Sequence, residues 1–353
     1  MRLDKRKPVS FARKWIRRIR ILLSLLPLVV RYRSYLMSPK SSDTRSLHQF
    51  SQLMVLSPRL RSIPGMTSRP ERAYFFWFAK HIFCGHGEIV DLGCGFGSTT
   101  IPLAMGLVDN PRSDPIHRHI HAYDTFLLTP GGANARLMQS HKRDFAGALQ
   151  IQPGQSFLQE FNRRTAPWKN RIRAHAEDLS QSTWNGPEIE LLLVDAMKSW
   201  ALTNNIIRQF FPALVPGTSF LIHQDFAHWW PSWIHLVQYR LRHYFDPVYD
   251  VPGASSLVFE LVRPIPSEVL KAEYSFSSFM PREIDAAFDY SMHLVSREKH
   301  SEIAAAKVMV FLHLRDVHNA ERELEHFRSQ GFSFSSSLGM VEDRLRRMRA
   351  DRG

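Results

Sequence analysis

Residues 87–100 read GEIVDLGCGFGSTT and decide the fold. Residues 88–92 form a short apolar run with an acid near its end, which predicts a buried strand. Three alternate glycines follow, at Gly93, Gly95 and Gly97, and the next residues suit the start of a helix. Glycine lets a backbone turn sharply and approach a ligand closely, and a helix N-terminus offers unpaired N–H donors. The stretch therefore predicts a cradle for a ligand that carries ribose, phosphate or carboxylate.

The spacing of the glycines distinguishes two kinds of ligand. The dinucleotide fingerprint is G-x-G-x-x-G, and Ser98 stands where its third glycine belongs. Asp91 lies two residues before the first glycine, and this arrangement resembles the first motif of class I S-adenosylmethionine-dependent methyltransferases. The resemblance implies that Asp91, Gly93, Gly95 and Gly97 lie at the amino-acid end of S-adenosylmethionine. A turn with a purely structural role is the alternative.

The positive charge is confined to one end of the chain. The 353 residues carry a formal net charge of +13, which would suit a nucleic-acid partner. Residues 1–40 hold twelve basic side chains and one acidic one, so the remainder holds 34 basic and 32 acidic side chains. The body of the protein is nearly neutral, which argues against a nucleic-acid groove across the fold. Its length suits one large α/β domain with attachments.

The basic arm also contains an apolar run. Residues 21–30 read ILLSLLPLVV and number only ten, whereas a bilayer-spanning helix needs about 20. Arg31 and Arg33 follow where a signal peptide would have a small-residue cleavage site. Residues 1–45 are therefore predicted to be a basic amphipathic arm, which either lies on an anionic membrane surface or docks on its own domain.

The cysteines indicate the cellular setting. Cys84 and Cys94 are too few for a disulfide scaffold, and their spacing matches no C-x-x-C metal motif. A reducing cytosol is the simplest setting, and the arm adds the expectation of peripheral membrane association.

Two further strand ends carry acids. Residues 120–126 predict a second strand with Asp124 near its end, where a carboxylate can accept hydrogen bonds from both ribose hydroxyls. Residues 171–179 predict the third strand and its exit. Class I methyltransferases place an acidic or polar residue there against the adenine, so the resemblance implies cofactor contacts for Glu177 and Asp178. The alternatives are an exposed turn residue at Asp124 and a helix N-cap at Asp178.

The clearest strand is residues 189–194, nearly all apolar, as expected of a central parallel strand covered on both faces. Asp195 follows it. A turn, LVPG at 214–217, leads into a fifth strand at 218–222, and His223, Gln224 and Asp225 follow that strand. This layout resembles the macrocin-type O-methyltransferases, related to catechol O-methyltransferases, in which an acid after strand four and an acid pair after strand five hold a divalent metal.

The resemblance implies a Mg²⁺ site formed by Asp195, Gln224 and Asp225, with Gln224 in place of the first acid of the pair. An amide oxygen can bind Mg²⁺, but the loss of one carboxylate weakens the site. A bound metal would hold the substrate hydroxylate and lower its pKa.

Metal-free catalysis is the second interpretation, with His223 or His228 as general base. A third is that these residues have no catalytic role and His223 only forms a hydrogen bond within the cleft. Lys198 either orients an anionic substrate or pairs with Asp225.

The elements after the fifth strand separate methyltransferases from dehydrogenases. Residues 226–233 read FAHWWPSW, an aromatic cluster that either forms an apolar substrate wall or belongs to the core. Residues 248–251 and 255–262 predict a closing hairpin around the turn at 252–254. A terminal antiparallel hairpin is typical of the seven-stranded methyltransferase sheet, whereas a dehydrogenase usually continues with parallel units.

Residues 266–353 are predicted to be a helical extension. Ala304, Val308, Phe311 and Leu312 share one helical face, and Gly331 suits a helix stop. Since a single helical pair cannot bury its own face, the extension is expected to pack on the catalytic domain or on another subunit of a homo-oligomer.

The sequence thus predicts an α/β protein with a Rossmann-like class I methyltransferase fold: a seven-stranded, mostly parallel sheet at residues 46–265 with a closing antiparallel hairpin. The predicted function is S-adenosylmethionine-dependent O-methylation of a small hydroxylated acceptor, such as a sugar or natural product. Two rivals remain: a nicotinamide-dependent oxidoreductase, and an inactive methyltransferase-like scaffold associated with membranes.

Overall fold

The computed structural model describes residues 58–112, 117–145, 150–334 and 337–350. The predicted N-terminal arm at residues 1–45 lies outside them. None of the helices formed by these residues is long and apolar enough to cross a bilayer.

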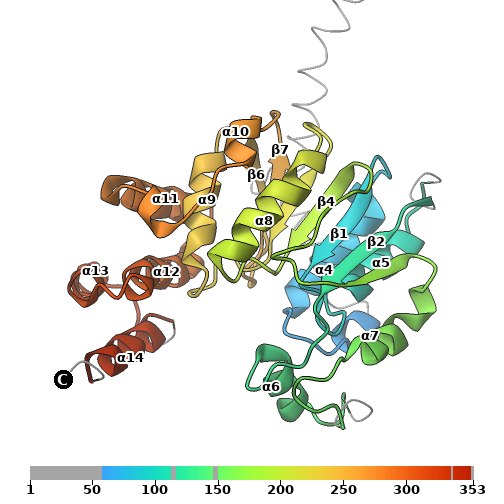
Figure 1. The fold of residues 1–353 in the computed structure, drawn as a ribbon, viewed down its shortest axis with the longest axis horizontal. Helices are drawn as coiled ribbons and strands as arrows, with labels where there is room; N and C mark the ends of the chain where they lie inside the picture. The colour runs from blue at the N-terminus through green and yellow to red at the C-terminus, as the bar shows by residue number, and fades with distance from the viewer. Residues whose placement is uncertain (1–57, 113–116, 146–149, 335–336, 351–353) are drawn as a thin grey trace, which may run out of the picture. The chain divides into compact units, whose positions relative to one another are not determined.

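Seven strands form one sheet in the order β3-β2-β1-β4-β5-β7-β6 (Figure 1). The strands are β1 (Glu88–Leu92), β2 (Ile120–Asp124), β3 (Ile172–Ala176), β4 (Ile189–Val194), β5 (Phe220–His223), β6 (Phe245–Asp250) and β7 (Leu257–Leu261). Strands β1 to β5 pair in parallel, and β7 enters antiparallel between β5 and β6. The predicted Rossmann-like class I methyltransferase fold, with its closing hairpin, is therefore confirmed.

This strand order indicates where a ligand crevice is expected. The chain moves outward from β1 through β2 to β3, then returns to the other side of β1 with β4 and β5. In open α/β sheets the crevice lies at such a reversal, outside the carboxyl ends of the strands. Strands β1 and β4 are buried at every residue, as apolar strands covered on both faces should be, whereas the edge strand β3 is largely exposed.

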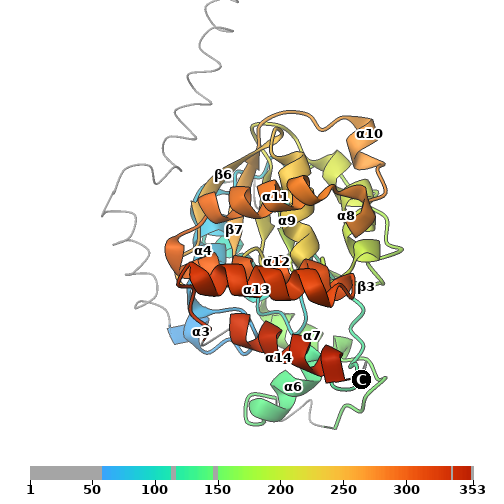
Figure 2. The same ribbon diagram turned by 90° about the vertical axis from the view of Figure 1, so that its left-hand side faces the viewer.

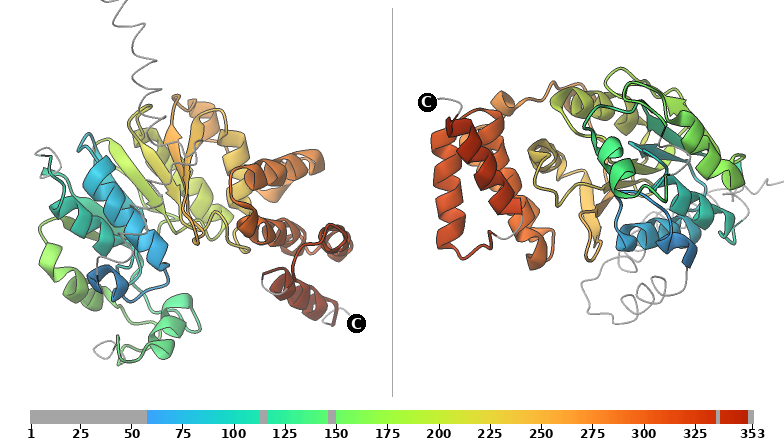
Figure 3. Two further views of the ribbon diagram at one scale, coloured as in Figure 1. Left: turned by 180° about the vertical axis from the view of Figure 1, so that it is seen from behind. Right: turned by 90° about the horizontal axis from the view of Figure 1, so that it is seen from below.

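Helices cover both faces of the sheet (Figures 1 and 3). On one face lie α4 (Arg69–Trp77), the π-helix η1 (Phe78–Ile82), α5 (Thr100–Val108) and α7 (Leu158–Thr165); on the other lie α8 (Trp200–Phe210) and α9 (Ser232–Leu241). Shorter elements are α3 (Pro58–Arg61), α6 (Ala133–Ser140), η4 (Ala166–Trp168) and η5 (Phe211–Ala213). Helix α4 continues directly into the π-helical turn η1.

The C-terminal extension is helical, as predicted. It contains α10 (Ser267–Leu270), η6 (Phe276–Ser278), α11 (Pro281–His293), η7 (Arg297–Lys299), α12 (His300–His313), α13 (Val317–Ser329) and α14 (Ser337–Ala350). Helices α11 and α12 pack on α9, and α13 and α14 pack on α12 (Figure 2). Gly331 has φ +80° just after α13, as expected of a helix stop. The extension was expected to pack on the catalytic domain or on another subunit. The described residues show it packed on the catalytic domain.

Candidate active site

The glycine loop between β1 and α5 has a backbone that other residues rarely adopt. Gly93, Gly95 and Gly97 have φ values of +89°, +51° and +89°. A Cβ on Gly93 would lie 2.6 Å from the backbone oxygen of Asp195, which follows β4. The loop is fixed to β2 because the N–H groups of Gly93 and Cys94 both donate to the Tyr123 carbonyl. The glycines therefore shape a fixed concavity at the carboxyl end of the sheet.

Asp91, near the end of β1, stabilises the segment that follows this loop. It is fully buried, and its Oδ2 accepts hydrogen bonds from the hydroxyls of Thr99, at 2.8 Å, and Thr100, at 2.6 Å. Burial raises its pKa to about 7, against the lowering effect of these two hydrogen bonds. Its other oxygen, Oδ1, is buried without a hydrogen-bond partner among the described residues. A buried acceptor of this kind suits a ligand ammonium or a water held beneath it.

Asp124 lies where the sequence predicted a ribose ligand. At the end of β2, its Oδ2 accepts the Gly95 N–H at 3.0 Å and its Oδ1 accepts the Phe126 N–H at 2.8 Å. Phe126 has φ +50°, an uncommon value for a residue with a side chain. Burial raises the pKa of Asp124. Since a carboxylate offers about four lone-pair sites, both oxygens can still accept a ligand hydroxyl.

The two acids after β3 differ in their surroundings. Glu177 is exposed, donates its N–H to the Asp124 carbonyl, and places a carboxylate oxygen 3.8 Å from His175 Nδ1. Asp178 accepts the Ser180 N–H at 2.8 Å and thereby closes a turn. No helix begins there, so the alternative of a helix N-cap at Asp178 is wrong. Glu177 thus lies beside Asp124, and Asp178 stabilises a turn.

A lysine joins the acids that follow β4 and β5. Lys198 Nζ lies 2.8 Å from Asp195 Oδ1 and also contacts Asp225 Oδ2. The pairing of Lys198 with Asp225, one of two predicted roles, is therefore present. The lysine side chain is 43% exposed, and the two carboxylate side chains are 17% and 13% exposed. All three groups consequently remain reachable from solvent at the carboxyl edge of the sheet.

Glu71, on α4, is a site residue that sequence reasoning missed. Its Oε1 accepts hydrogen bonds from Ser256 Oγ at 2.7 Å and Gln224 Nε2 at 3.2 Å, and its Oε2 accepts the Ser68 N–H. Burial raises its pKa, and the nearby Asp195 carboxylate raises it further. Glu71 therefore fixes the Gln224 amide. Its only sequence signal was the S-x-x-E capping box at residues 68–71.

This arrangement does not fit the predicted Mg²⁺ site without rearrangement. The Lys198 ammonium contacts both carboxylates, and Gln224 directs its amide N–H toward Glu71. A dication bridging Asp195 and Asp225 would have to displace that ammonium, since like charges repel strongly at hydrogen-bond distance. In the described part of the chain, Cys84, His86 and Glu190 do lie close enough to share an ion. They precede β1 and begin β4, at the opposite edge of the sheet.

The histidines proposed as general bases are both held neutral. His223 is 2% exposed, lies against Gln238 of α9 at 3.3 Å, and burial lowers its pKa to about 4. This position favours the interpretation in which His223 forms only an internal hydrogen bond. His228 is half-buried; burial and then the Lys198 charge lower its pKa to about 4. Its Nδ1 accepts the Trp230 N–H, so Nε2 carries the proton and acts as a donor.

The residues present fit S-adenosylmethionine. The glycine concavity and the unpartnered Asp91 oxygen suit the amino-acid end of the cofactor, and Asp124 suits its ribose. Together with the strand order, these features define a class I methyltransferase fold with a concavity where the strand order reverses.

Comparison with known proteins adds little beyond the fold. No protein family and no curated protein matches the chain. Among solved structures, the O-methyltransferase NovP has 16% sequence identity and a TM-score of 0.41, covering 56% of this chain and 84% of its own. The structure described as StiE O-MT residues 942-1257 has 16% identity and a TM-score of 0.25, covering 65% of this chain and 63% of its own. The assignment of fold therefore rests on the strand order and the glycine loop.

Proposed function

We propose that this protein is an S-adenosylmethionine-dependent methyltransferase that O-methylates a small hydroxylated acceptor. The observation that carries the proposal is the glycine loop. Its three glycines have left-handed backbone conformations and lie where the strand order reverses, next to the buried Asp91 and to Asp124. In this proposal Asp91, Gly93, Gly95 and Gly97 hold the amino-acid end of the cofactor. Asp124 binds the ribose, with Glu177 and Asp178 on the adenine side.

When bound, S-adenosylmethionine supplies an electrophilic methyl group. The protein then has to align the acceptor hydroxyl and remove its proton. Asp195 and Asp225 are partly buried carboxylates that solvent can still reach, and they are the best placed to accept that proton. Lys198, an ammonium between them, stabilises the developing oxyanion, a kind of contribution worth about 10²–10³ in rate. Glu71 and Gln224 position the strand end that carries Asp225.

Calorimetry with S-adenosylhomocysteine and with NAD⁺ tests this proposal against its rivals. We expect S-adenosylhomocysteine to bind and NAD⁺ not to bind. Binding of NAD⁺ alone would instead identify an oxidoreductase, although the antiparallel β7 already disfavours that class. Binding of neither would favour an inactive scaffold.

We also propose that residues 1–45 attach the protein to anionic membranes from the cytoplasmic side, because thirteen basic side chains surround a short apolar run there. Cosedimentation with phosphatidylserine vesicles should require these residues. Equal sedimentation of the full chain and of a chain lacking them would refute the proposal.

A further inference from the structure

A group of metal-ligating side chains lies at the amino edge of the sheet, opposite the edge that carries the glycine loop. Cys84 and His86 belong to the loop between η1 and β1, and Glu190 is the second residue of β4. The thiol sulfur, an imidazole nitrogen and a carboxylate oxygen of these residues lie within 4.8 Å of one another. Ligand atoms around a tetrahedral zinc ion are roughly 3.3–3.8 Å apart, given the usual bond lengths to zinc. The three atoms therefore lie near the separation that one shared ion requires.

Glu190 is the residue that needs an explanation. It is the one acid in the apolar strand β4, and it is completely buried. Its Oε1 accepts the Cys84 N–H and its Oε2 accepts the His86 N–H, both at 2.6 Å, which uses about half of the lone-pair sites of a carboxylate. Within the described part of the chain, the partners of this carboxylate are N–H groups and no cationic side chain. Buried charges in proteins are paired or bind metals, so a cation is expected beside Glu190.

The backbone brings the loop against β4. The register of β1 on β4 shifts between Glu88 and Ile89, and this shift leaves Glu190 out of the pairing. Such an irregularity redirects a side chain. Gly87 approaches β4 so closely that a Cβ on it would lie 2.6 Å from the Glu190 nitrogen. Gly85 has φ +83°, so the chain turns sharply between the thiol and the imidazole.

Side chains from the segment before β2 hold the other side of the loop. Asn110 and Arg112 both donate to the Phe83 carbonyl, at 2.8 and 3.1 Å. Arg118 donates to the Gly85 carbonyl at 2.8 Å. Hydrogen bonds outside the ligand set orient the ligands of metal sites in the same way, so an ion would meet ligands that are already positioned.

We propose that Cys84, His86 and Glu190 bind one Zn²⁺ ion, which attaches the loop before β1 to β4. A thiolate and an imidazole are ligands that suit Zn²⁺, whereas Mg²⁺ and Ca²⁺ take oxygen ligands. The thiolate and the carboxylate together neutralise the charge of the ion. His86 is exposed and Cys84 half-buried, so the fourth tetrahedral position is open to a water molecule. On binding, the Cys84 sulfur releases the proton that it otherwise donates to the Ile82 carbonyl.

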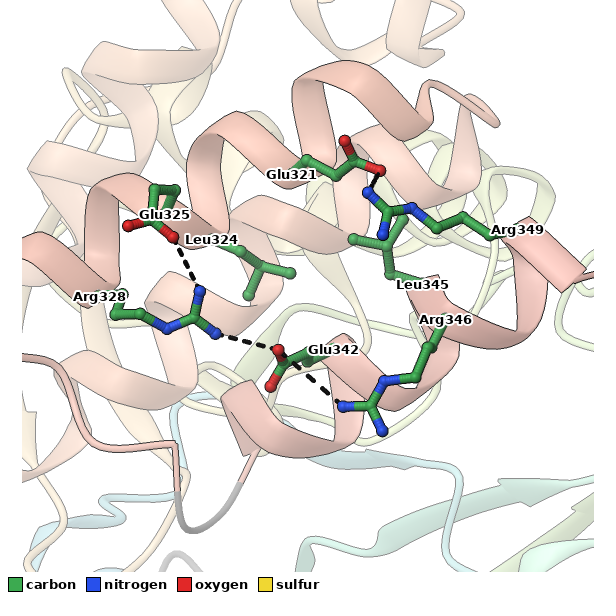
Figure 4. Close-up of a pocket in the computed structure, with 8 residues that line it drawn as sticks. All are labelled: Glu321, Leu324, Glu325, Arg328, Glu342, Leu345, Arg346 and Arg349. Carbon is green, nitrogen blue, oxygen red and sulfur yellow. Dashed lines mark hydrogen bonds and ion pairs between the residues drawn. The ribbon is translucent and has the colours of Figure 1, made fainter.

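The acids of the C-terminal helices form no comparable site in the described part of the chain. A cavity of about 260 Å³ lies between α13 and α14, and its lining includes Glu321, Glu325 and Glu342 (Figure 4). Arg328 bonds to Glu325 and Glu342, and Arg349 contacts Glu321. Each of these carboxylates already has a cationic partner, whereas the buried acid of β4 has N–H donors alone among the described residues.

Titration of the full-length, tag-free protein with Co²⁺, after removal of metals by a chelator, tests the site. Co²⁺ replaces Zn²⁺ in sites of this kind and reports a thiolate ligand by a charge-transfer band in the near ultraviolet. One equivalent of Co²⁺ should produce this band, Zn²⁺ should abolish it, and an excess of Mg²⁺ should not. Zn²⁺ at about 100 times its dissociation constant should also raise the melting temperature by roughly 5 °C. Absence of the band overturns the proposal.

Matched variants locate the ion. Cys84→Ser should remove the charge-transfer band, and His86→Gln should weaken Co²⁺ binding by more than about tenfold. Cys94→Ala changes the other cysteine, and His243→Gln changes an equally exposed histidine outside the site; both should keep the band and the affinity. A band that survives Cys84→Ser or is lost in Cys94→Ala overturns the proposal, as does equal affinity in the two histidine variants. None of these outcomes bears on the methyltransferase function, because the site lies at the opposite edge of the sheet from the glycine loop.

Discussion

Gly93→Ala should weaken binding at the proposed cofactor site through a steric clash, an effect that can be separated from backbone strain. The substitution places a side chain at φ +89°, which costs roughly 1–2 kcal/mol in folding free energy. It also places a Cβ 2.6 Å from the Asp195 carbonyl oxygen, closer than the 3.0 Å below which something must shift. The exit of β4 therefore has to move by about 0.4 Å relative to the glycine loop, the difference between these two distances.

Gly154→Ala is the matched control. Gly154 has φ +88°, and no atom lies within 4 Å of the position that a Cβ would take, so the same strain arises there without a clash. Because the residues of a binding site have to be held to within about 0.5 Å of their productive positions, a shift of this size should weaken binding roughly tenfold.

Both variants should lose a few degrees of melting temperature, and only Gly93→Ala should lose affinity for S-adenosylhomocysteine by calorimetry. Equal affinities in the two folded variants would refute the reasoning that Gly93 and Asp195 together define the cradle. Loss of affinity in Gly154→Ala would refute it as well, because that loop lies outside the proposed site.

The geometry of the site supports three further predictions. Asp124→Asn should weaken S-adenosylhomocysteine binding by about tenfold, because hydrogen bonds to a charged acceptor contribute about 1.5–3 kcal/mol. Calorimetry measures this loss, with Thr125→Val as the control. Unchanged affinity would contradict the ribose role of Asp124. Wild-type protein should show no Mg²⁺ binding by calorimetry. The Lys198→Met variant should bind Mg²⁺, because Asp195 and Asp225 then lose the ammonium that neutralises them. Mg²⁺ binding by the wild type at the same affinity would show that Lys198 does not prevent it. Burial lowers the pKa of His223 to about 4 from an ordinary value of 6.5, so its contribution to the free energy of unfolding is complete above pH 6.5 and declines as the pH falls toward 4, by about 2 kcal/mol at pH 5. The melting temperature of His223→Gln should therefore fall less steeply than that of the wild type over this range. Parallel curves for the two proteins would exclude the effect.

The strand order was predictable because each strand ends in a recognisable signal. The apolar run at 189–194 and the turn at 214–217 determine β4 and the approach to β5, and the turn at 252–254 determines the hairpin. These are local signals, in which residues near one another in the chain decide the conformation. The paired positions of Asp124 and Gly95 followed from the fold once the strand ends were known.

The charge pattern inside the site was not predictable to the same extent. The contact of Lys198 with both Asp195 and Asp225 depends on the separation of two strand ends and on a side-chain rotamer, and neither leaves a periodic trace in the sequence. Glu71 was missed for a related reason. It occupies a capping box, a complete local explanation, while its contacts with Gln224 and Ser256 span 153 and 185 positions of the chain.

The burial of α12 has a consequence for how the chain folds. Every residue from Ile303 to Val310 is buried, so this helix is enclosed by α9 and α11 on one side and by α13 and α14 on the other. Helix α9 in turn packs on β5 through the same continuous core. The C-terminal helices should therefore unfold together with the sheet in one cooperative transition. A chain ending near residue 265 would leave the outer face of α9 bare and should aggregate instead of forming a smaller active enzyme.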